Sequence, residues 1–352
     1  MTTSPEPATP AVCPNCGRAV GATDNFCEAC RTELAPPVVS GDAPVTVTEC
    51  AFCHAGQITA DGYCESCGRK VPSSRDHLEL DLGPVAGVTD KGLRHARNED
   101  AMALATAESA SGPAVLAVVC DGVSSSRRPD EASLAAVQAA IGVLLAGVRG
   151  DEDLAETSQA AVAAAQQALA RLDEPGPGDA PSATFVSAVM TMDSVTLCWL
   201  GDSRAYWLGA GTGSDANRLT RDDSLAGEMV AAGLVSESDA MALPGAHVVT
   251  GWVGADAPGA APHVATFTPP GPGVLLLCSD GLWNYQPDAA GLARLALPGA
   301  LSDLLGTAAA LVKFALEAGG ADNITVVLAP FPPAAPKPEE KPADETPSVN
   351  HG

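Results

Sequence analysis

The sequence predicts an α+β fold in which antiparallel sheets carry helices on their outer faces. Two observations lead to this class. Apolar runs of strand length form groups on either side of two consecutive alanine-rich helical stretches, an order that regular strand-helix alternation does not produce. The 46% hydrophobic content of the 352 residues is also ample for a sizeable core. We therefore expect one large domain, at residues 82–330, with smaller segments on either side of it.

The individual elements follow from the hydrophobic period and from capping residues. Short apolar runs predict strands at 85–89, 101–106, 114–120, 184–191, 195–200, 205–208, 264–268, 274–278 and 324–329. Longer stretches of helical period, some opened by Asp or Ser, predict helices at 129–148, 151–172, 224–232 and 301–318. Strands therefore occur in runs, and the two longest helices follow one another directly.

The first 70 residues contain an internal repeat of cysteine pairs. Two CxxC pairs with ten residues between them occur twice, at a constant offset of 37 residues: Cys13, Cys16, Cys27 and Cys30, then Cys50, Cys53, Cys64 and Cys67. Four thiolates at this spacing can hold one Zn²⁺ tetrahedrally and replace a missing core. We therefore predict two zinc ribbons, at 13–34 and 50–71, with two structural Zn²⁺ ions in total. Redox disulfides are the less favoured interpretation.

The termini and the charge limit the remaining classes. Residues 1–12 and 331–352 are rich in proline and lack periodicity, which predicts disordered tails. The formal net charge of −24 disfavours binding to nucleic acids and to anionic membranes. No uninterrupted apolar run approaches the roughly 20 residues of a membrane span, and the opening MTTSPEPATP lacks a secretion signal. We therefore expect a cytoplasmic protein with neither nucleic-acid nor membrane partners.

Aspartates stand at the ends of several predicted strands. Asp121, Asp202 and Asp280 follow apolar runs, whereas Asp100 and Asp322 stand just before strands. Because the end of one antiparallel strand lies beside the start of its neighbour, all five can meet at one edge. Hard divalent cations relieve the repulsion among clustered carboxylates, and all-oxygen ligation favours Mg²⁺ or Mn²⁺ over zinc. A single Asp-Gly pair would more simply mark a turn, but the repeated placement favours a metal cluster.

Seven ordered segments between residues 92 and 328 resemble the motifs of one enzyme family. They are GLRHARNEDA, VVCDGV, SAT, LGDSRAY, LTRDDS, CSDGLW and ADNITVVL. In this order they resemble protein phosphatase 2C, a family of metal-dependent serine/threonine phosphatases. The resemblance implies a four-layer αββα sandwich of two antiparallel sheets, with a two-metal centre at one end. It also implies phosphorylated proteins as substrates and a cognate serine/threonine kinase as a partner.

The resemblance implies roles for the metal ligands. Asp121 would bridge two Mn²⁺ or Mg²⁺ ions, Gly122 would offer its carbonyl to one of them, and Asp280 and Asp322 would hold the other. A hydroxide held between two cations is a strong nucleophile at neutral pH. We therefore expect phosphoserine and phosphothreonine to be hydrolysed by a metal-bound hydroxide, without a phosphoenzyme.

The remaining polar and sulfur-containing positions receive secondary roles. By resemblance, Asp100 would act through metal-bound waters, and Asp202 matches the position linked to a third metal in bacterial members. Two or three Mn²⁺ or Mg²⁺ ions per catalytic domain follow. Cys120, Cys198 and Cys278 stand inside apolar strands, which predicts packed thiols rather than nucleophiles.

Two positions depart from the family pattern and keep other classes open. The arginine that grips the substrate phosphate in many members is replaced by His95, with Arg94 and Arg97 nearby, and a later motif has Asp223 where a histidine is expected. His95 is a candidate phosphate ligand or a simple surface residue. A weakly active or inactive phosphatase-like binding module, recruited through its ribbons, is the alternative function. A zinc-ribbon nucleic-acid protein is disfavoured by the negative charge.

Overall fold

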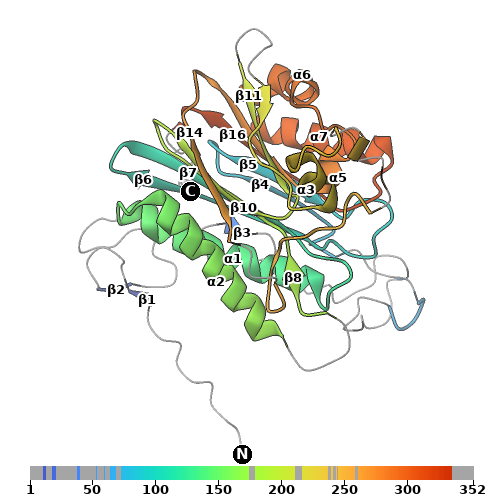
Figure 1. The fold of residues 1–352 in the computed structure, drawn as a ribbon. Coiled ribbons are helices and arrows are strands. Elements are labelled where there is room, and N and C mark those ends of the chain that lie inside the picture. The colour runs from blue at the N-terminus through green and yellow to red at the C-terminus, as the bar shows by residue number, and fades with distance from the viewer. Residues whose placement is uncertain are drawn as a thin grey trace, which may run out of the picture.

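The structure is a computed structural model, and it describes residues 11–12, 18–20, 38–39, 53, 59, 64–68, 73–173, 179–210, 216–236, 239–240, 243, 245–257 and 261–334. Two six-stranded sheets form its centre, and helices cover the outer face of each sheet (Figure 1). The predicted four-layer αββα sandwich is therefore confirmed.

The first sheet has the strand order β14-β10-β9-β7-β6-β3, and all neighbours are antiparallel. Its strands are β3 (Val38–Val39), β6 (Asp100–Ser109), β7 (Gly112–Asp121), β9 (Phe185–Met190), β10 (Val195–Leu200) and β14 (His263–Phe267). The central strands are buried on both faces, which explains why they are nearly continuous apolar runs in the sequence.

The second sheet has the order β12-β11-β15-β16-β5-β4, again antiparallel throughout. Its strands are β4 (His77–Asp81), β5 (Ala86–Asp90), β11 (Arg204–Gly209), β12 (Ala216–Arg218), β15 (Gly273–Cys278) and β16 (Ile324–Phe331). Two short pairs complete the strands: β1 (Ala11–Val12) with β2 (Ala19–Val20), and β8 (Ser182–Ala183) with β13 (Val253–Gly254).

Most helices begin at a side chain that caps the first turn. The helices are α1 (Pro129–Arg149), α2 (Leu154–Leu172), α3 (Leu225–Ala231), α5 (Asp280–Trp283), α6 (Ala289–Ala300) and α7 (Leu304–Ala318). The side chains of Asp153, Ser224, Asp288 and Asp303 accept hydrogen bonds from first-turn N–H groups. These caps satisfy donors that the helix itself leaves unpaired.

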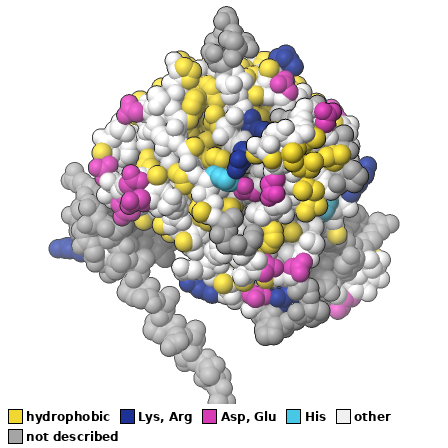
Figure 2. Space-filling view, viewed as in Figure 1, with side chains coloured by type: hydrophobic (Ala, Val, Ile, Leu, Met, Phe, Trp, Pro, Cys, Tyr) yellow, Lys and Arg dark blue, Asp and Glu magenta, His cyan; other side chains and the backbone are white. Residues whose placement is uncertain are grey.

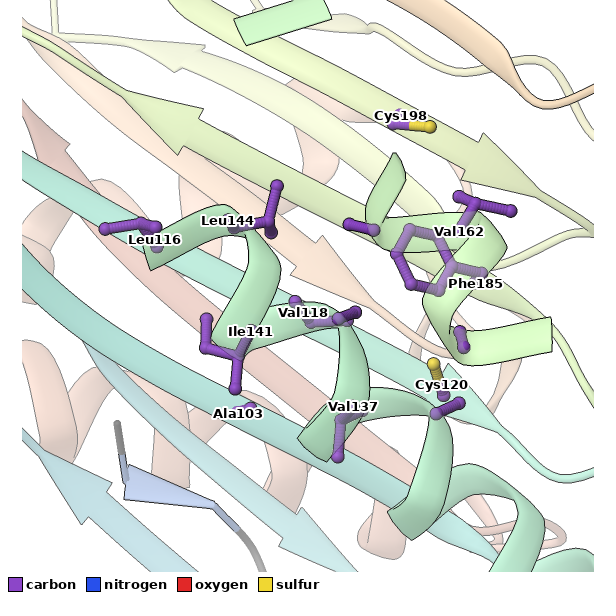
Figure 3. Close-up of a cluster of buried hydrophobic side chains, with 14 of the residues drawn as sticks. Ala103, Leu116, Val118, Cys120, Val137, Ile141, Leu144, Val162, Phe185 and Cys198 are labelled. Carbon is purple, nitrogen blue, oxygen red and sulfur yellow. The ribbon is translucent and has the colours of Figure 1, made fainter. Parts of the chain in front are cut away.

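Three apolar clusters hold the layers together. One lies between the two sheets, one between the first sheet and helices α1 and α2, and one between the second sheet and helices α5 to α7. Figure 3 shows the second of these, where Ile141 and Leu144 of α1 face Leu116 and Val118 of β7. Burial of such apolar side chains stabilises the sandwich by about 25 cal/mol per Å² removed from water.

Several elements were not predicted from the sequence. The domain begins at β4 rather than at residue 82. The strand was missed because HLELD alternates between exposed and half-buried positions on a sheet edge. Helix α6 was also missed; it contains Pro298, which normally ends a helix, near its last turn. The predicted tails are shorter at their inner ends, since Ala11 and Val12 form β1 and Phe331 ends β16. Residues 1–10 and 335–352 of the two predicted tails lie outside the described residues.

Helix α1 packs on the first sheet, although its composition would also suit a membrane span. Within the described residues, it is the one helix long and apolar enough to span a membrane. More than half of the relevant window, 56%, is buried inside the protein. Its buried side chains, which include Val137 and Ile141, belong to the cluster shared with β6 and β7.

Candidate metal centre

The strand ends bring the predicted aspartates to one edge of the sandwich. Asp100, the first residue of β6, is the direct partner of Asp121, the last residue of β7. Cys278 at the end of β15 pairs with Val326 near the start of β16, so Asp280 and Asp322 lie on the same side of that pair. Asp202 stands in the turn that leads from β10 of the first sheet to β11 of the second. The expected convergence is therefore present.

The five carboxylates act on one another electrostatically. Burial raises the pKa of Asp121 well above its usual range, and the charges of Asp100, Asp280, Asp322 and Asp202 raise it further. Burial is also the main cause of the raised pKa of three other aspartates. The pKa of Asp280 is raised well above its usual range, that of Asp202 to about 7 and that of Asp100 to about 6. Such a cluster is unfavourable when ionised unless positive charge compensates it.

Two buried carboxylate oxygens in this cluster have no hydrogen-bond partner within the described part of the chain. They are Oδ1 of Asp100 and Oδ1 of Asp280. The other oxygen of Asp100 accepts hydrogen bonds from Ser279 at 2.6 Å and Thr325 at 2.7 Å, and that of Asp280 accepts one from Asn284 at 3.0 Å. Unpaired buried oxygens among all-oxygen donors fit a hard divalent cation such as Mn²⁺ or Mg²⁺.

The glycines beside these aspartates are required by close backbone contacts. A Cβ on Gly122 would lie 2.3 Å from the carbonyl oxygen of Pro129, and one on Gly281 would lie 1.9 Å from the carbonyl oxygen of Asn323. Neither position can therefore hold a side chain without moving the backbone. The turn interpretation of the two Asp-Gly pairs is incomplete, because both glycines also allow the strand ends to approach their neighbours.

The loop before β6 places the basic residues near the cluster. Nε2 of His95 lies 3.1 Å from Oδ1 of Asp322, so the imidazole contacts a predicted metal ligand directly. Nε of Arg97 donates to Glu99 at 3.0 Å and lies 3.4 Å from Asp130. Arg94 is exposed, and no ion pair or hydrogen bond joins it to another described residue. Of these three residues, Arg94 is the one that is not engaged with a described carboxylate.

Asp223, which stands where a histidine is expected in the LTRDDS motif, contacts a histidine from another strand. Nε2 of His263, at the start of β14, lies 2.7 Å from Oδ1 of Asp223. The other oxygen of Asp223 accepts a hydrogen bond from the amide of Gly201, next to Asp202, at 3.0 Å. Gly201 has φ of 100°, a conformation that favours glycine. Asp223 therefore supports the turn that carries Asp202.

A cavity of about 750 Å³ is lined by residues of β11, β12 and α5 and by the start of α6, and none of the five clustered aspartates lines it. Asn284, which donates to Asp280, lines it together with His247, Trp283 and Arg218. Figure 2 shows one face of the molecule, where basic, acidic and histidine side chains gather near the middle beside a hydrophobic patch. The cavity can hold a ligand larger than an ion, and Asn284 is the residue that links its lining to Asp280.

The sequence profile of protein phosphatase 2C matches residues 93–295. This range contains four of the five clustered aspartates and covers more than half of the chain. The chain belongs to the protein phosphatase 2C family.

Curated relatives and a solved structure agree with membership of the protein phosphatase 2C family. The chain is 35% identical over 147 residues to serine/threonine phosphatase stp of Listeria welshimeri serovar 6b, with 41% of this chain and 55% of that protein covered. It is 29% identical over 249 residues to serine/threonine protein phosphatase PstP of Mycobacterium tuberculosis, with 69% and 44% covered. The chain thus spans about half the length of these relatives.

One solved structural neighbour contains manganese. The catalytic domain of serine threonine protein phosphatase PstP, in complex with 2 manganese ions, has a TM-score of 0.54 and 26% identity. The alignment covers 70% of this chain and 97% of that one. The two manganese ions of that structure agree with the all-oxygen cluster found here.

Several residues that support the protein phosphatase 2C centre were missed by sequence reasoning. Ser279 and Thr325 hold Asp100, and the side chain of Asn323 accepts a hydrogen bond from the amide of Glu99 at 2.8 Å. Thr184 accepts one from the amide of Asp121 at 3.1 Å. All stand next to or within the quoted motifs, so their position was a signal, but their partners lie far away in the sequence.

The cysteines fall into two groups within the described residues. Cys120, Cys198 and Cys278 are fully buried, and burial raises the pKa of each, that of Cys198 to about 12. They are packed thiols, as predicted, and not nucleophiles. The sulfur atoms of Cys53, Cys64 and Cys67 lie within 4.8 Å of one another, as ligands of one metal ion would. Cys50 and the whole first ribbon set lie outside the described residues.

Proposed function

We propose that this chain is a protein serine/threonine phosphatase that depends on Mn²⁺ or Mg²⁺. The observation that carries the proposal is the cluster of five carboxylates, two of them with buried oxygens that lack partners. Membership of the protein phosphatase 2C family supports the same activity. Because the chain spans only part of its curated relatives, the reaction and the substrate class belong to this proposal.

The residues of the cluster would hold the cations in the arrangement that the family resemblance implies. Asp121, with the carbonyl of Gly122, Asp280 and Asp322 are the proposed direct ligands, and Asp100 and Asp202 complete the site. Mn²⁺ or Mg²⁺ bound here would acidify a coordinated water and neutralise charge on the phosphate. Ser279 and Thr325 fix the orientation of Asp100, and Asn284 fixes that of Asp280. Fixed ligands reduce the reorganisation that the reaction requires.

The substrate would approach over the loop before β6. Arg94 is exposed there and offers a planar guanidinium, which suits a phosphate group. His95 is engaged with Asp322, so we propose that it supports the metal ligand more than it binds phosphate. The cavity beside Asn284 would take the residues that flank the phosphorylated serine or threonine. A cognate serine/threonine kinase, as the source of the substrate, rests on family analogy alone.

The activity test uses the full chain and two substrates. We expect Mn²⁺-dependent hydrolysis of p-nitrophenyl phosphate and of a phosphothreonine peptide. The release of inorganic phosphate measures both reactions. Asp280→Ala should lower turnover by about 10³-fold, because it removes a charge that acts where the transition state develops. Asp193→Ala, at an exposed aspartate between β9 and β10, is the matched control and should keep full activity.

The same experiment separates the enzyme from the binding module. The contact between His95 and Asp322 is the observation that favours the inactive binding module. His95 stands where many family members have the arginine that grips the phosphate, and here it is engaged with Asp322 instead. No turnover at any Mn²⁺ or Mg²⁺ concentration, with the protein folded, would contradict the phosphatase and leave the module. Activity in wild type that survives Asp280→Ala would contradict the assignment of the site.

We also propose that each cysteine set binds one structural Zn²⁺. The three sulfur atoms of Cys53, Cys64 and Cys67 support this for the second set. Metal analysis of the purified chain should find about two zinc ions, and Cys64→Ser should reduce this to about one. A zinc content that does not change in the variant would contradict the second ribbon. A cytoplasmic location stays a prediction.

A further inference from the structure

A short segment links the second cysteine cluster to the catalytic sheets. Cys64 and Cys67 belong to that cluster, and Gly68 closes its turn with a hydrogen bond to the carbonyl of Cys64 at 2.8 Å. Ser73–Asp76, here named the strap, follows five residues after Gly68 and leads directly into β4. In the chain, the strap therefore lies between the cysteine cluster and the first strand of the second sheet.

The backbone of the strap is bonded to the loop that carries Asp100. The side-chain amide of Asn98 donates to the carbonyl of Arg75 at 3.1 Å and to the hydroxyl of Thr89 at 2.9 Å. Its oxygen accepts a hydrogen bond from the amide of Asp100 at 3.2 Å. Asn98 is only 3% exposed, so these bonds do not compete with water.

The hydroxyls continue this connection to the carboxylate itself. Thr89 and Thr325 lie 2.7 Å apart, and Thr325 donates to Oδ2 of Asp100 at 2.7 Å. A chain of buried hydrogen bonds thus runs from Asn98, beside the strap, to a residue of the metal centre. Loss of one bond in such a buried network leaves polar groups unpaired and affects its neighbours.

The side chain of Arg75 anchors the strap to the start of α1. Its guanidinium donates to the carbonyl of Asp130 at 3.0 Å and lies 4.0 Å from the carboxylate of the same residue. That carboxylate also lies 3.4 Å from Arg97, which donates to Glu99 beside Asp100. Arg75 therefore reaches the loop by a second route, through Asp130 and Arg97.

The last residue of the strap reaches the other side of the metal centre. The carbonyl of Asp76 accepts a hydrogen bond from the amide of Lys91 at 2.8 Å. The carbonyl of Lys91 accepts one from the side chain of Asn323, also at 2.8 Å, and that side chain binds the amide of Glu99. Asn323 is adjacent to Asp322. The strap therefore contacts structures that hold both Asp100 and Asp322.

We propose that the strap couples the second cysteine cluster to the metal centre, with Arg75 as the positioning residue. When the cluster is ordered by a metal, the strap is held against Asn98 and Asp130 and keeps the loop 94–100 in place. When the cluster loses its metal, the strap loosens and the loop loses part of its support. The inference rests on the proposed function only in that it concerns the regulation of the same site.

The test measures the loop in the full chain without substrate. Hydrogen-deuterium exchange is followed at the amides of Glu99 and Asp100 in wild type, Arg75→Ala and Cys64→Ser. We expect roughly five-fold faster exchange in both variants, the factor that corresponds to one lost hydrogen bond. Titration calorimetry should show Mn²⁺ binding weakened by a similar factor, because the carboxylates are less well positioned.

Two comparisons make the result specific to the strap. Arg294 also lies 4.0 Å from an aspartate, Asp288, but its side chain is 73% exposed on the outer side of α6, so Arg294→Ala should change neither quantity. Amides in the middle of α7 should exchange as in wild type, which excludes general destabilisation. Unchanged exchange at Glu99 and Asp100 in either Arg75→Ala or Cys64→Ser would overturn the coupling, as would equal acceleration throughout the protein. Neither readout uses phosphatase activity, so the two proposals can fail separately.

Discussion

At the scale of single residues, the metal centre depends on neutral side chains as much as on its aspartates. Asp100 is 1% exposed and points one oxygen at Ser279 and Thr325, while the other has no described partner. Two hydroxyl donors stabilise the ionised carboxylate against the cost of burial. They also decide which oxygen remains available for a cation.

Removal of one donor should weaken the centre without removing a ligand. In Ser279→Ala, Asp100 keeps only Thr325, so its pKa should rise and its contribution to cation binding should fall. We expect the Mn²⁺ concentration for half-maximal activity to increase about 10-fold, in line with the loss of a charge-assisted hydrogen bond. Ser302→Ala, at an exposed serine that bonds to the carbonyl of Gly299, is the control. An unchanged Mn²⁺ requirement in Ser279→Ala would show that this hydroxyl has no such role.

A buried ion pair beside the centre should be important for stability. Arg204 is 1% exposed, lies over the ring of Trp283 and binds Asp222 through Nε at 3.0 Å and Nη2 at 2.6 Å. Asp222→Ala would leave a buried guanidinium without its partner, at a cost of about 3–5 kcal/mol. Urea unfolding of the metal-free chain measures this cost. A loss below about 1 kcal/mol would indicate that water enters and solvates Arg204.

At the scale of elements, helix α1 connects the core to the site. Its first turn contacts Gly122, where a Cβ would meet the carbonyl of Pro129, and Asp130 in the same turn receives Arg75 and Arg97. The rest of the helix buries its apolar face on the first sheet (Figure 3). Packing of α1 therefore fixes one wall of the metal centre.

A substitution that leaves a cavity under α1 should destabilise the sandwich. Ile141 is 1% exposed in the cluster between α1 and the first sheet, so Ile141→Ala should lower the free energy of unfolding by about 2–5 kcal/mol. Leu295→Ala on α6, where the side chain is 42% exposed, should cost less than about 1 kcal/mol. Thermal or urea unfolding compares the two. Equal costs would mean that the interior under α1 collapses to fill the space.

At the scale of the whole molecule, the metal-free chain carries an electrostatic strain at its active edge. The folded protein raises the pKa of Asp100 to about 6 and that of Asp202 to about 7, mainly through burial. In the unfolded chain both groups titrate near 3.9. The folded state therefore binds more protons than the unfolded state between these values, and folding stability falls as pH rises through this range.

This linkage predicts how cations and pH act together. In the presence of a chelator, the melting temperature should fall as pH rises from about 4 to about 7. Saturating Mn²⁺ should remove most of the decline, because the cations favour the ionised carboxylates. Asp202→Asn should also flatten the metal-free profile, since it removes one titrating group. A metal-free melting temperature that increases from pH 5 to pH 7 would contradict the raised pKa values.

The amino-acid sequence by itself determined where most strands lie and which aspartates stand at their ends. Strong apolar runs with Asp at their ends predicted β5 to β7, β9 to β11 and β14 to β16, and the convergence of five carboxylates followed from antiparallel pairing. Local period carries this information, because a buried strand needs apolar side chains whatever its partner is. Weak periods were missed, as for the exposed edge strand β4 and the proline-containing helix α6.

Only the tertiary structure decided how those aspartates are held. Thr325 is 225 positions from Asp100, His263 is 40 from Asp223, and Asn323 is 224 from Glu99. It also decided that His95 contacts Asp322, and that the strap reaches both sides of the centre. Such contacts leave no periodic signal in the sequence, since they depend on which layers pack together. A local pattern specifies the elements, whereas the partners of each polar side chain exist only once the two sheets have closed on each other.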